Sequence, residues 1–163
     1  MKVRDFMKTD VISIETKTSV MEAQNIMWEK NIKRLPVMKK GKLIGLVTKH
    51  MLLEASPSSA TSLSVFELNY LLSKMTVDDI MVKDPITIFP DDPVEAAIWL
   101  GKKHGISTFP VVKDGKLLGI ITEHDIAGVL SEVLGVESEG TRLTVKGLGS
   151  KLGELQEIIG VLD

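Results

Sequence analysis

One segment of the chain brings hydroxyl, imidazole and carboxylate groups close together. It reads Thr122-Glu123-His124-Asp125-Ile126 and follows an apolar run. A carboxylate can accept hydrogen bonds from both hydroxyls of a sugar diol, and a hydroxyl beside the amides of a helix N-terminus suits a phosphate. Thr122, just before an expected helix, and Asp125, in its first turn, could therefore face one ligand that carries both groups. Thr122 would face the phosphate and Asp125 the diol.

A structural role is open to the same two residues. Thr122 is a suitable N-cap for the helix that follows it, and the helix dipole stabilises an acid in the first turn, such as Asp125. Helix starts favour these residue types in all proteins. The pair taken alone therefore favours the structural role.

The chain offers little for other site chemistry. It contains no Cys, which excludes disulfide scaffolds, thiolate zinc sites and cysteine nucleophiles. Its three His have no metal-type spacing, and its Gly residues form neither a Walker nor a dinucleotide fingerprint. No nucleophile, base and orienting residue stand together as a set. We therefore predict a protein that is not an enzyme, with no catalytic residue and no metal site.

Composition limits the class of protein. The chain has 163 residues, a formal net charge of -2, 44% apolar and 26% charged residues, which suits one or two small domains with a core. Near-neutral charge argues against a nucleic-acid binder. No apolar run approaches the ~20 residues that span a bilayer, and the N-terminus lacks the apolar core of a signal peptide. We expect a cytoplasmic protein that binds neither nucleic acid nor membranes.

An internal repeat organises the chain. When the sequence is compared with itself at an offset of 74 residues, segment 3–55 matches 77–129 at 18 of 53 positions without a gap. Repeats of this kind reflect one structural unit used more than once. The matches include Pro36-Val37 with Pro110-Val111, Gly41-Lys42-Leu43 with Gly115-Lys116-Leu117, Thr48 with Thr122, and His50 with His124.

Each copy predicts a β-α-β-β-α unit. A short strand is expected at 11–14 and 85–89, and a helix follows each one. Ser19 with Glu22 forms a capping box at the first helix, while Asp92, Pro93 and Glu95 suit the N-cap, N1 and N3 positions of the second. Two hairpins, 35–47 and 109–121, turn at a Gly, and a further helix begins after Thr48 and after Thr122.

The remaining segments define the domain boundaries. Residues 54–63 are rich in Ser and Ala and read as a loop. A capping box at Ser64 and Glu67 begins a short helix. Near the C-terminus, 141–146 suit a strand and 152–159 a helix, a piece too small to fold alone. We expect repeat 1 at 1–56, a linker with a short helix at 57–74, repeat 2 at 75–135 and a partial domain at 140–163.

The repeated motifs resemble a tandem pair of cystathionine-β-synthase (CBS) domains, often called a Bateman module. The most specific elements are the two Pro-Val pairs, the Gly-apolar-apolar-Thr strands that end at Thr48 and Thr122, and the segment 122–126. The resemblance implies a mixed α/β (α+β) fold of two CBS repeats related by pseudo-twofold symmetry. Segments 51–58 and 64–68 are more narrowly similar to bacterial acetoin-utilisation regulatory proteins, and 141–162 resemble the first strand and helix of an ACT domain.

The resemblance also implies where a ligand binds. Members of this family bind adenosine-containing ligands such as AMP, ADP, ATP or S-adenosylmethionine in the clefts between the repeats, and no further cofactor is required. By this analogy the Asp125 cleft also takes residues from the opposite repeat. The candidates are Thr122, His124, Asp125, Ile12, Lys33, Arg34, Ser107 and Thr108, the last two as phosphate donors.

The two clefts are not expected to be equal. In the first copy the motif is Thr48-Lys49-His50-Met51, so Met51 replaces the acid that would bind ribose. We expect this cleft, with Thr48, His50 and Ile86, to bind weakly, to bind another ligand or to stay empty. Met51 itself suits packing better than a cofactor role.

Charge and aromatic residues add smaller indications. Residues 30–50 hold seven basic residues and no acid, and a basic face near Lys33 and Arg34 would suit a phosphate tail. Lys39, Lys40 and Lys42 fit the solvation of a turn better. Trp28 and Trp99 fall within predicted helices and suit packing or an interface better than base stacking.

These observations predict a regulatory module that senses an adenosyl ligand and acts on a protein partner or an attached domain. CBS pairs commonly form disc-like homodimers, so the resemblance implies a dimer, and it also suggests a link to acetoin utilisation. A ligand can shift the arrangement of repeats or subunits only if it binds one arrangement better than the other. The alternative is a dimerisation or interaction scaffold whose clefts bind nothing, which the missing acid at Met51 supports.

Overall fold

The computed structural model describes residues 1–55 and 64–133. Its contacts group Met1–Val129 into one compact unit, separate from Leu130–Asp163. The first unit holds both copies of the sequence repeat. The predicted ACT-like segment at 140–163 lies outside the described residues, as does most of the predicted 54–63 loop.

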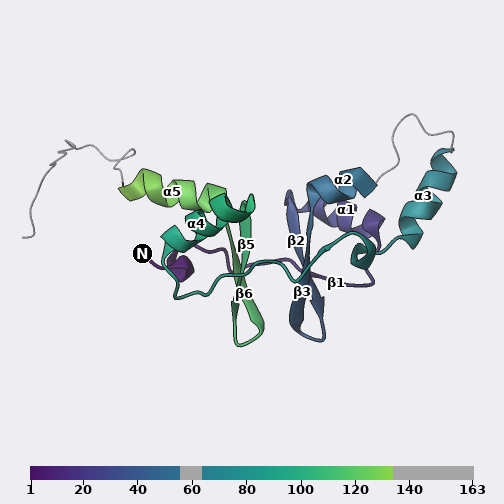
Figure 1. The fold of residues 1–163 in the computed structure, drawn as a ribbon. Helices are drawn as coiled ribbons and strands as arrows, with labels where there is room; N and C mark the ends of the chain where they lie inside the picture. Colours follow the sequence, from purple (N-terminus) through teal and green to yellow (C-terminus); the bar gives the residue numbers. More distant parts are fainter. Residues whose placement is uncertain (56–63, 134–163) are drawn as a thin grey trace, which may run out of the picture. The chain divides into compact units, whose positions relative to one another are not determined.

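The first repeat is built on a four-stranded sheet with the order β1-β2-β3-β4 (Figure 1). β1 runs parallel to β2, and the other neighbours are antiparallel. Two helices belong to this repeat and contact each other, and α2 begins directly where β3 ends. The bounds are β1 Ile14–Glu15, α1 Val20–Glu29, β2 Arg34–Lys39, β3 Lys42–Thr48, α2 Lys49–Ala55 and β4 Val82–Lys83.

The second repeat has the same connectivity with a shorter sheet. β5 and β6 form an antiparallel hairpin, and isolated bridges complete its two edges. Ile88 pairs in parallel with Val111, as β1 pairs with β2, and Lys8 pairs antiparallel with Ile120, as β4 pairs with β3. The bounds are α4 Val94–His104, β5 Thr108–Lys113, β6 Lys116–Thr122 and α5 Glu123–Val133. The predicted mixed fold of two β-α-β-β-α repeats is confirmed.

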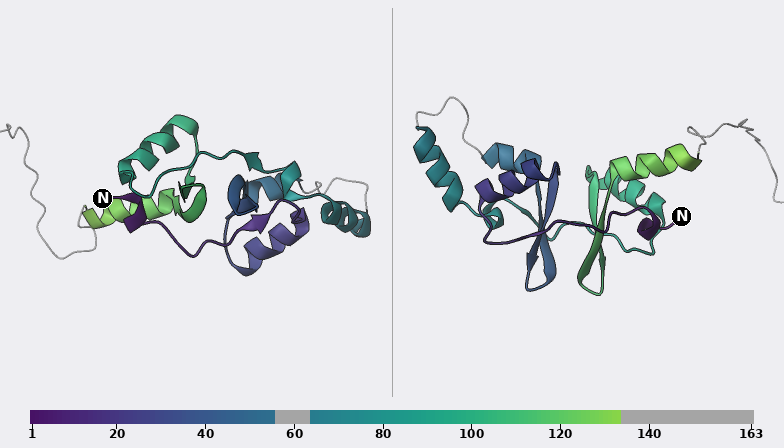
Figure 2. Two further views of the ribbon diagram at one scale, coloured as in Figure 1. Left: turned by 90° about the horizontal axis from the view of Figure 1, so that it is seen from below. Right: turned by 180° about the vertical axis from the view of Figure 1, so that it is seen from behind.

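The two repeats exchange their leading segments. Val3 lies fully buried in the core of the second repeat, while Val77 lies fully buried in the core of the first. Figures 1 and 2 show the purple N-terminal segment starting beside α4 and α5 and crossing to β1, while the teal segment after α3 (Val65–Lys74) crosses in the opposite direction. The predicted boundaries at 56 and 75 separate the two copies of the sequence. The packed repeats do not follow these boundaries, because each of them also contains about eight residues of the other copy.

Several local predictions hold. Ser64 with Glu67 forms a complete capping box at α3, whereas at the start of α1 only half of the predicted box is present, the bond from the Glu22 amide to the Ser19 hydroxyl. α2 and α5 begin directly after the two Thr. Both hairpins turn on two residues with positive φ, Lys40-Gly41 and Asp114-Gly115, which is the type I′ geometry that suits twisted strands.

Three other predictions are wrong in their limits. The strand expected at 11–14 is reduced to Ile14–Glu15, and the one expected at 85–89 contributes one bridge at Ile88. Pro85 has no N–H to donate. α4 begins one residue later than expected, with Pro93 as the N-cap residue, because the Asp92 side chain instead accepts a hydrogen bond from the Phe89 amide.

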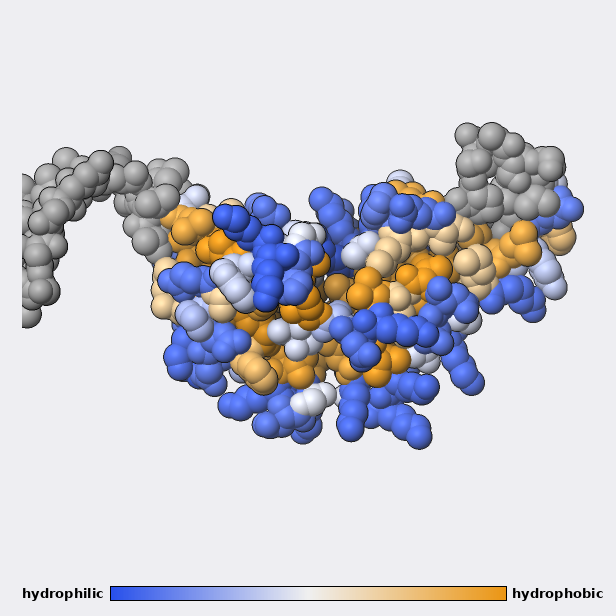
Figure 3. Space-filling view, viewed as in Figure 1, coloured by the Kyte–Doolittle hydropathy of each residue, from blue (hydrophilic) through white to orange (hydrophobic). Residues whose placement is uncertain are grey.

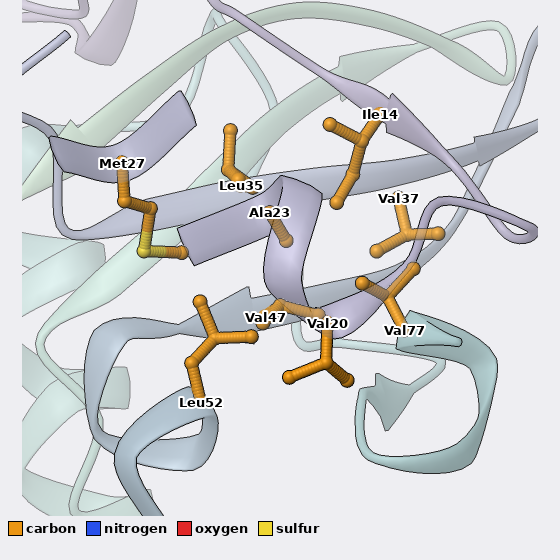
Figure 4. Packing of buried hydrophobic residues seen from close by; sticks show 9 residues of the cluster. All are labelled: Ile14, Val20, Ala23, Met27, Leu35, Val37, Val47, Leu52 and Val77. Carbon is orange, nitrogen blue, oxygen red and sulfur yellow. The ribbon is translucent and has the colours of Figure 1, made fainter. Parts of the chain in front are cut away.

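Each repeat has its own apolar core. Figure 4 shows the first core, in which residues of α1 face the side chains of β2 and β3, and Val77 reaches the same core from a neighbouring turn. The second core repeats the arrangement around Phe109 and Val111 of β5, with Val3 in the place of Val77. These cores hold the ends of β3 and β6, and therefore Thr48 and Thr122, at fixed positions.

Candidate ligand clefts between the repeats

Thr122 and Asp125 are locked together at the start of α5. One carboxylate oxygen of Asp125, Oδ2, accepts from the Thr122 hydroxyl at 2.6 Å and from the Thr122 amide at 2.9 Å. The Thr122 hydroxyl in turn accepts a weak bond from the Asp125 amide at 3.4 Å. This geometry is a capping box, so the structural role considered from the sequence is present in the molecule. It leaves the second carboxylate oxygen, Oδ1, for another partner.

That partner is Lys8, which no sequence motif singled out. The Lys8 ammonium lies 3.1 Å from Oδ1 of Asp125, and its side chain is 65% exposed whereas the Asp125 side chain is 9% exposed. Lys8 comes from the N-terminal segment that crosses onto the second repeat. The repeat alignment pairs Lys8 with Val82, so comparison of the two copies does not indicate a cation at this position. Lys8 can be placed near Asp125 only when it is known that the N-terminal segment packs on the second repeat.

The pKa of Asp125 reflects this environment. Burial acts to raise it, but hydrogen bonds from Thr122 and Lys8 and the charge of Lys8 together lower the pKa below its ordinary value. Asp125 is therefore a carboxylate at neutral pH, with one oxygen facing an exposed and replaceable cation.

A cavity of about 350 Å³ lies at the other cleft, beside Met51. Thr48 and Ile86, two of the residues expected at this cleft, both line the cavity, but its wall does not include His50, whose side chain is largely exposed and lies 3.3 Å from Glu54. Met51 donates its amide to the Thr48 hydroxyl at 3.3 Å. The first repeat thus keeps the cap but lacks the acid that would complete the box. The walls comprise Arg34, Leu46, Thr48, Met51, Val82, Asp84, Pro85, Ile86, Gly105, Ile106, Ser107 and Thr108.

Ser107 and Thr108 line this Met51 cavity, although the sequence assigned them to the Asp125 cleft as phosphate donors. The Thr108 side chain is buried, and its hydroxyl has no hydrogen-bond partner among the described residues. A buried hydroxyl without a partner costs stability.

Arg34 also lines the Met51 cavity and joins the two repeats there. Its Nη2 donates to the Ser107 hydroxyl at 2.8 Å. Burial lowers the pKa of Arg34, while the nearby charges of Glu123 and Asp125 oppose that shift. A guanidinium stays charged in proteins, so Arg34 brings a fixed positive charge to the wall of the Met51 cavity, within range of the charges of Glu123 and Asp125.

The other predicted site residues lie further from these groups. Ile12 is half-buried against the first core, and His124 is exposed on the first turn of α5. Lys33 lies with Lys49 on a separate surface cavity of about 760 Å³ along α1 and α2. Lys33 and its neighbour Arg34 thus line two different cavities.

The basic and aromatic residues outside the clefts are largely exposed. Lys39, Lys40 and Lys42 stand at the hairpin end, where Figure 3 shows hydrophilic residues at the bottom of the molecule, in line with solvation of a turn. Trp28 and Trp99 are 83% and 59% exposed, so packing inside the chain does not explain them.

Residues 1–55 and 64–133 offer neither a metal centre nor a membrane span. No group of three metal-ligating side chains in these segments lies close enough to hold an ion. None of their helices is long and apolar enough to cross a membrane.

Known proteins share both the repeat and its sequence. The family model described as CBS domain matches residues 3–58 and again 77–132. Homoserine O-acetyltransferase from Methanohalobium evestigatum is 33% identical over 132 residues, which are 80% of this chain and 24% of that protein. Inosine-5'-monophosphate dehydrogenase from Korarchaeum cryptofilum is 32% identical over 145 residues, which are 88% and 27%. The chain thus spans about a quarter of the length of these two enzymes.

Solved structures give closely similar folds. The CBS domain pair of protein MJ0100, in complex with 5'-methylthioadenosine and S-adenosyl-L-methionine, has a TM-score of 0.68 at 30% identity and covers 82% of this chain and 98% of its own. CBSX2 of Arabidopsis thaliana, in complex with AMP, has a TM-score of 0.68 at 29% identity, covering 81% and 97%. A putative acetoin utilisation protein (AcuB) from Vibrio cholerae has a TM-score of 0.69 at 24% identity, covering 87% and 98%.

Proposed function

The chain belongs to the CBS-domain family, and on that premise we propose that it is a regulatory module that binds an adenosine-containing ligand at Asp125. The ligand's ribose would meet Oδ1 of Asp125. Its phosphate or other tail would extend toward Thr122 and the basic groups supplied by the first copy.

One observation carries this proposal, namely the state of the Asp125 carboxylate. Oδ2 is fixed by Thr122, whereas Oδ1 meets only the exposed ammonium of Lys8 among the described contacts. Lys8 keeps most of its side chain in water, so it loses little when it leaves, and the hydroxyls of a diol can donate to the buried carboxylate in its place. The capping box then holds the carboxylate in place for that diol.

A second box in the same chain shows why the motif alone is insufficient. Thr76 and Asp79 make the same pair of hydrogen bonds, both at 2.9 Å. Asp79, however, is exposed, and no residue of the other repeat pairs with it among the contacts of the described chain. Asp125 differs because Lys8 and the charge of Arg34 surround it.

The relatives support the ligand class. Two CBS structures at 29% and 30% identity were solved with AMP and with 5'-methylthioadenosine and S-adenosyl-L-methionine, and these molecules share an adenosine group. The region shared with the two enzymes is only about a quarter of their length, so their activities are not assigned to this chain. A homodimer, a regulated protein partner, a cytoplasmic location and a link to acetoin utilisation remain predictions.

Calorimetric titration with AMP, ATP and S-adenosylmethionine tests the proposal. We expect at least one of them to bind wild-type protein at about one site per chain, with affinity lost or sharply reduced in Asp125→Asn. Asp79→Asn is the matched control, because it breaks the same kind of capping box away from the clefts and should leave binding unchanged. Equal affinity in wild type and Asp125→Asn would refute the assigned site.

The alternative function has its own outcome in this experiment. Thr122 and Lys8 together occupy both carboxylate oxygens of Asp125, so the carboxylate is satisfied without a ligand. A folded protein that forms a stable dimer and binds none of the three compounds would favour the interaction scaffold.

A further inference from the structure

Arg34 and Ser107 form a direct link between the two copies of the repeat. Arg34 is the first residue of β2, and Ser107 directly precedes β5. Their side chains meet in a partly buried hydrogen bond of 2.8 Å, which joins residues 73 positions apart. Both residues line the Met51 cavity.

The Ser107 backbone is tied to the Asp125 cleft. Its carbonyl accepts the amide of Glu123 at 3.0 Å, and Glu123 is the first residue of α5, two positions before Asp125. The first repeat has the same backbone bond, from the Lys49 amide to the Lys33 carbonyl at 2.9 Å. The matching position there is Lys33, which has no side-chain acceptor. The link between Arg34 and Ser107 is therefore not required by the repeated fold.

Arg34 lies between two competing partners. Its guanidinium donates to the neutral Ser107 hydroxyl, and the Ser107 carbonyl holds the start of α5 through the Glu123 amide. The charges of Glu123 and Asp125 are therefore near enough to act on Arg34. A guanidinium binds a phosphate through two parallel, charge-assisted hydrogen bonds, which are about twice as strong as a neutral one. A phosphate in the Asp125 cleft would therefore compete successfully with Ser107 for Arg34.

We propose that Arg34 is a relay between the two clefts, which leaves Ser107 for the anionic group of a ligand at Asp125 and so reshapes the wall of the Met51 cavity. The inference rests on the proposed function, because it requires a ligand at Asp125. It makes the Met51 cavity a reporter of that ligand. A compound that fills the Met51 cavity and holds the Arg34–Ser107 bond should lower the affinity for the ligand at Asp125. By linkage, the ligand at Asp125 lowers the affinity for that compound by the same factor.

The relay depends on the ligand's charge, which supplies a test with two matched ligands. AMP carries a phosphate, and adenosine has the same base and ribose without it. The protein is labelled with ¹³C at its methionine methyl groups, and the Met51 signal is assigned with Met51→Leu. We expect AMP to move the Met51 signal, and adenosine at saturation to leave it near its ligand-free position.

Ser107→Ala tests the link itself. Without the competing hydroxyl, Arg34 is free to meet the phosphate, so AMP should bind about two- to tenfold more tightly, while adenosine affinity should not change. The ligand-free Met51 signal should already lie near its AMP-bound position. Ser107→Thr keeps a hydroxyl and should restore the wild-type affinity and signal.

The outcomes separate this inference from the proposed function. If Asp125→Asn abolishes AMP binding but Ser107→Ala changes neither AMP affinity nor the Met51 response, the relay is wrong and the proposed function stands. If AMP still moves the Met51 signal in Asp125→Asn, AMP occupies the Met51 cavity itself and the relay is also wrong. If AMP, ATP, S-adenosylmethionine and adenosine all fail to bind the folded protein, both proposals fail; if S-adenosylmethionine alone binds at Asp125, the relay is wrong and the proposed function stands.

Discussion

The difference between the two clefts comes down to one residue at the same place on two equivalent helices. Thr48 and Thr122 both cap the helix that follows, and each accepts the amide three residues later. Asp125 returns two hydrogen bonds to its Thr, whereas Met51 cannot, because a thioether is only a weak acceptor. The first cleft keeps the capped start of the helix but lacks the carboxylate to which we assign ribose binding.

Met51→Asp should therefore create a second site. The new carboxylate can complete the capping box with Thr48, and Arg34 in the same cavity offsets its charge. We expect calorimetry to give about two adenosyl ligands per chain in place of one. Met51→Asn is the control, since a neutral amide accepts through one atom only, and it should leave the stoichiometry unchanged. A Met51→Asp protein that remains folded with a single site would contradict the explanation.

Asp125 also predicts how stability depends on pH. Burial alone would raise the native pKa of Asp125, but its bonds to Thr122 and Lys8 outweigh burial and lower that pKa, so the ionised form stabilises the fold. This contribution is present above the unfolded pKa of about 3.9 and disappears as the pH falls through the lower native pKa.

Chemical denaturation of wild type and Asp125→Asn at a series of pH values checks the sign. The wild-type advantage in unfolding free energy should be largest near neutral pH and should shrink below pH ~4. Lys8→Met should reduce that advantage without abolishing it. If the difference in unfolding free energy between wild type and Asp125→Asn were the same at every pH, the carboxylate charge would not contribute to stability.

At the scale of elements, local signals were predictable and long-range pairing was not. The two turns at Gly41 and Gly115 and the start of α3 at Ser64 depend on residues that are neighbours in sequence, and they were predicted correctly. The bridge between Lys8 and Ile120 joins residues more than a hundred positions apart. The hydrophobic pattern of a segment does not show which distant segment pairs with it. The sequence therefore gives no indication of Lys8 near Asp125, and it predicts wrong limits for the edge strands.

The matching glycines Gly45 and Gly119 do carry a trace of this pairing. A Cβ built at Gly119 would lie 2.8 Å from the Lys8 carbonyl and 2.7 Å from Met7 Sδ. Met81 and the Val82 carbonyl take the same places at Gly45. A glycine inside a strand signals close approach of another backbone, and here that backbone is the exchanged segment.

Gly119→Ala should consequently destabilise the protein, by about 1–3 kcal/mol as for other overpacked sites, because the Lys8 backbone must move. Gly128→Ala is the opposite control. Gly128 lies inside α5, and no atom beyond the helix's own backbone comes within 4 Å of the place that an added Cβ would take, so this change should stabilise by up to ~1 kcal/mol. Denaturant midpoints measure both. Equal effects at the two positions would contradict the close approach at Gly119.

At the scale of the whole molecule, the exchange of segments makes each repeat depend on the other copy. Val3 and Val77 are both fully buried and stand at matching positions, yet each sits in the core of the opposite copy. Lys2 and Arg4 further fasten the N-terminal segment to Asp91, at 3.2 and 2.7 Å. Neither sequence copy contains all of its own core, so the repeats should unfold together.

The two tryptophans allow this prediction to be measured repeat by repeat. Trp28 lies on α1 and Trp99 on α4. The fluorescence of Trp28 in the Trp99→Phe variant therefore reports on the first repeat, and the fluorescence of Trp99 in the Trp28→Phe variant reports on the second. Both reporters should give the same denaturant midpoint. Val3→Ala should lower both midpoints together, through a loss of about 1.5–3 kcal/mol, and Val77→Ala should do the same. If Val3→Ala moved only the Trp99 signal, the repeats would be independent, and a ligand held between them would have no packed unit through which to act.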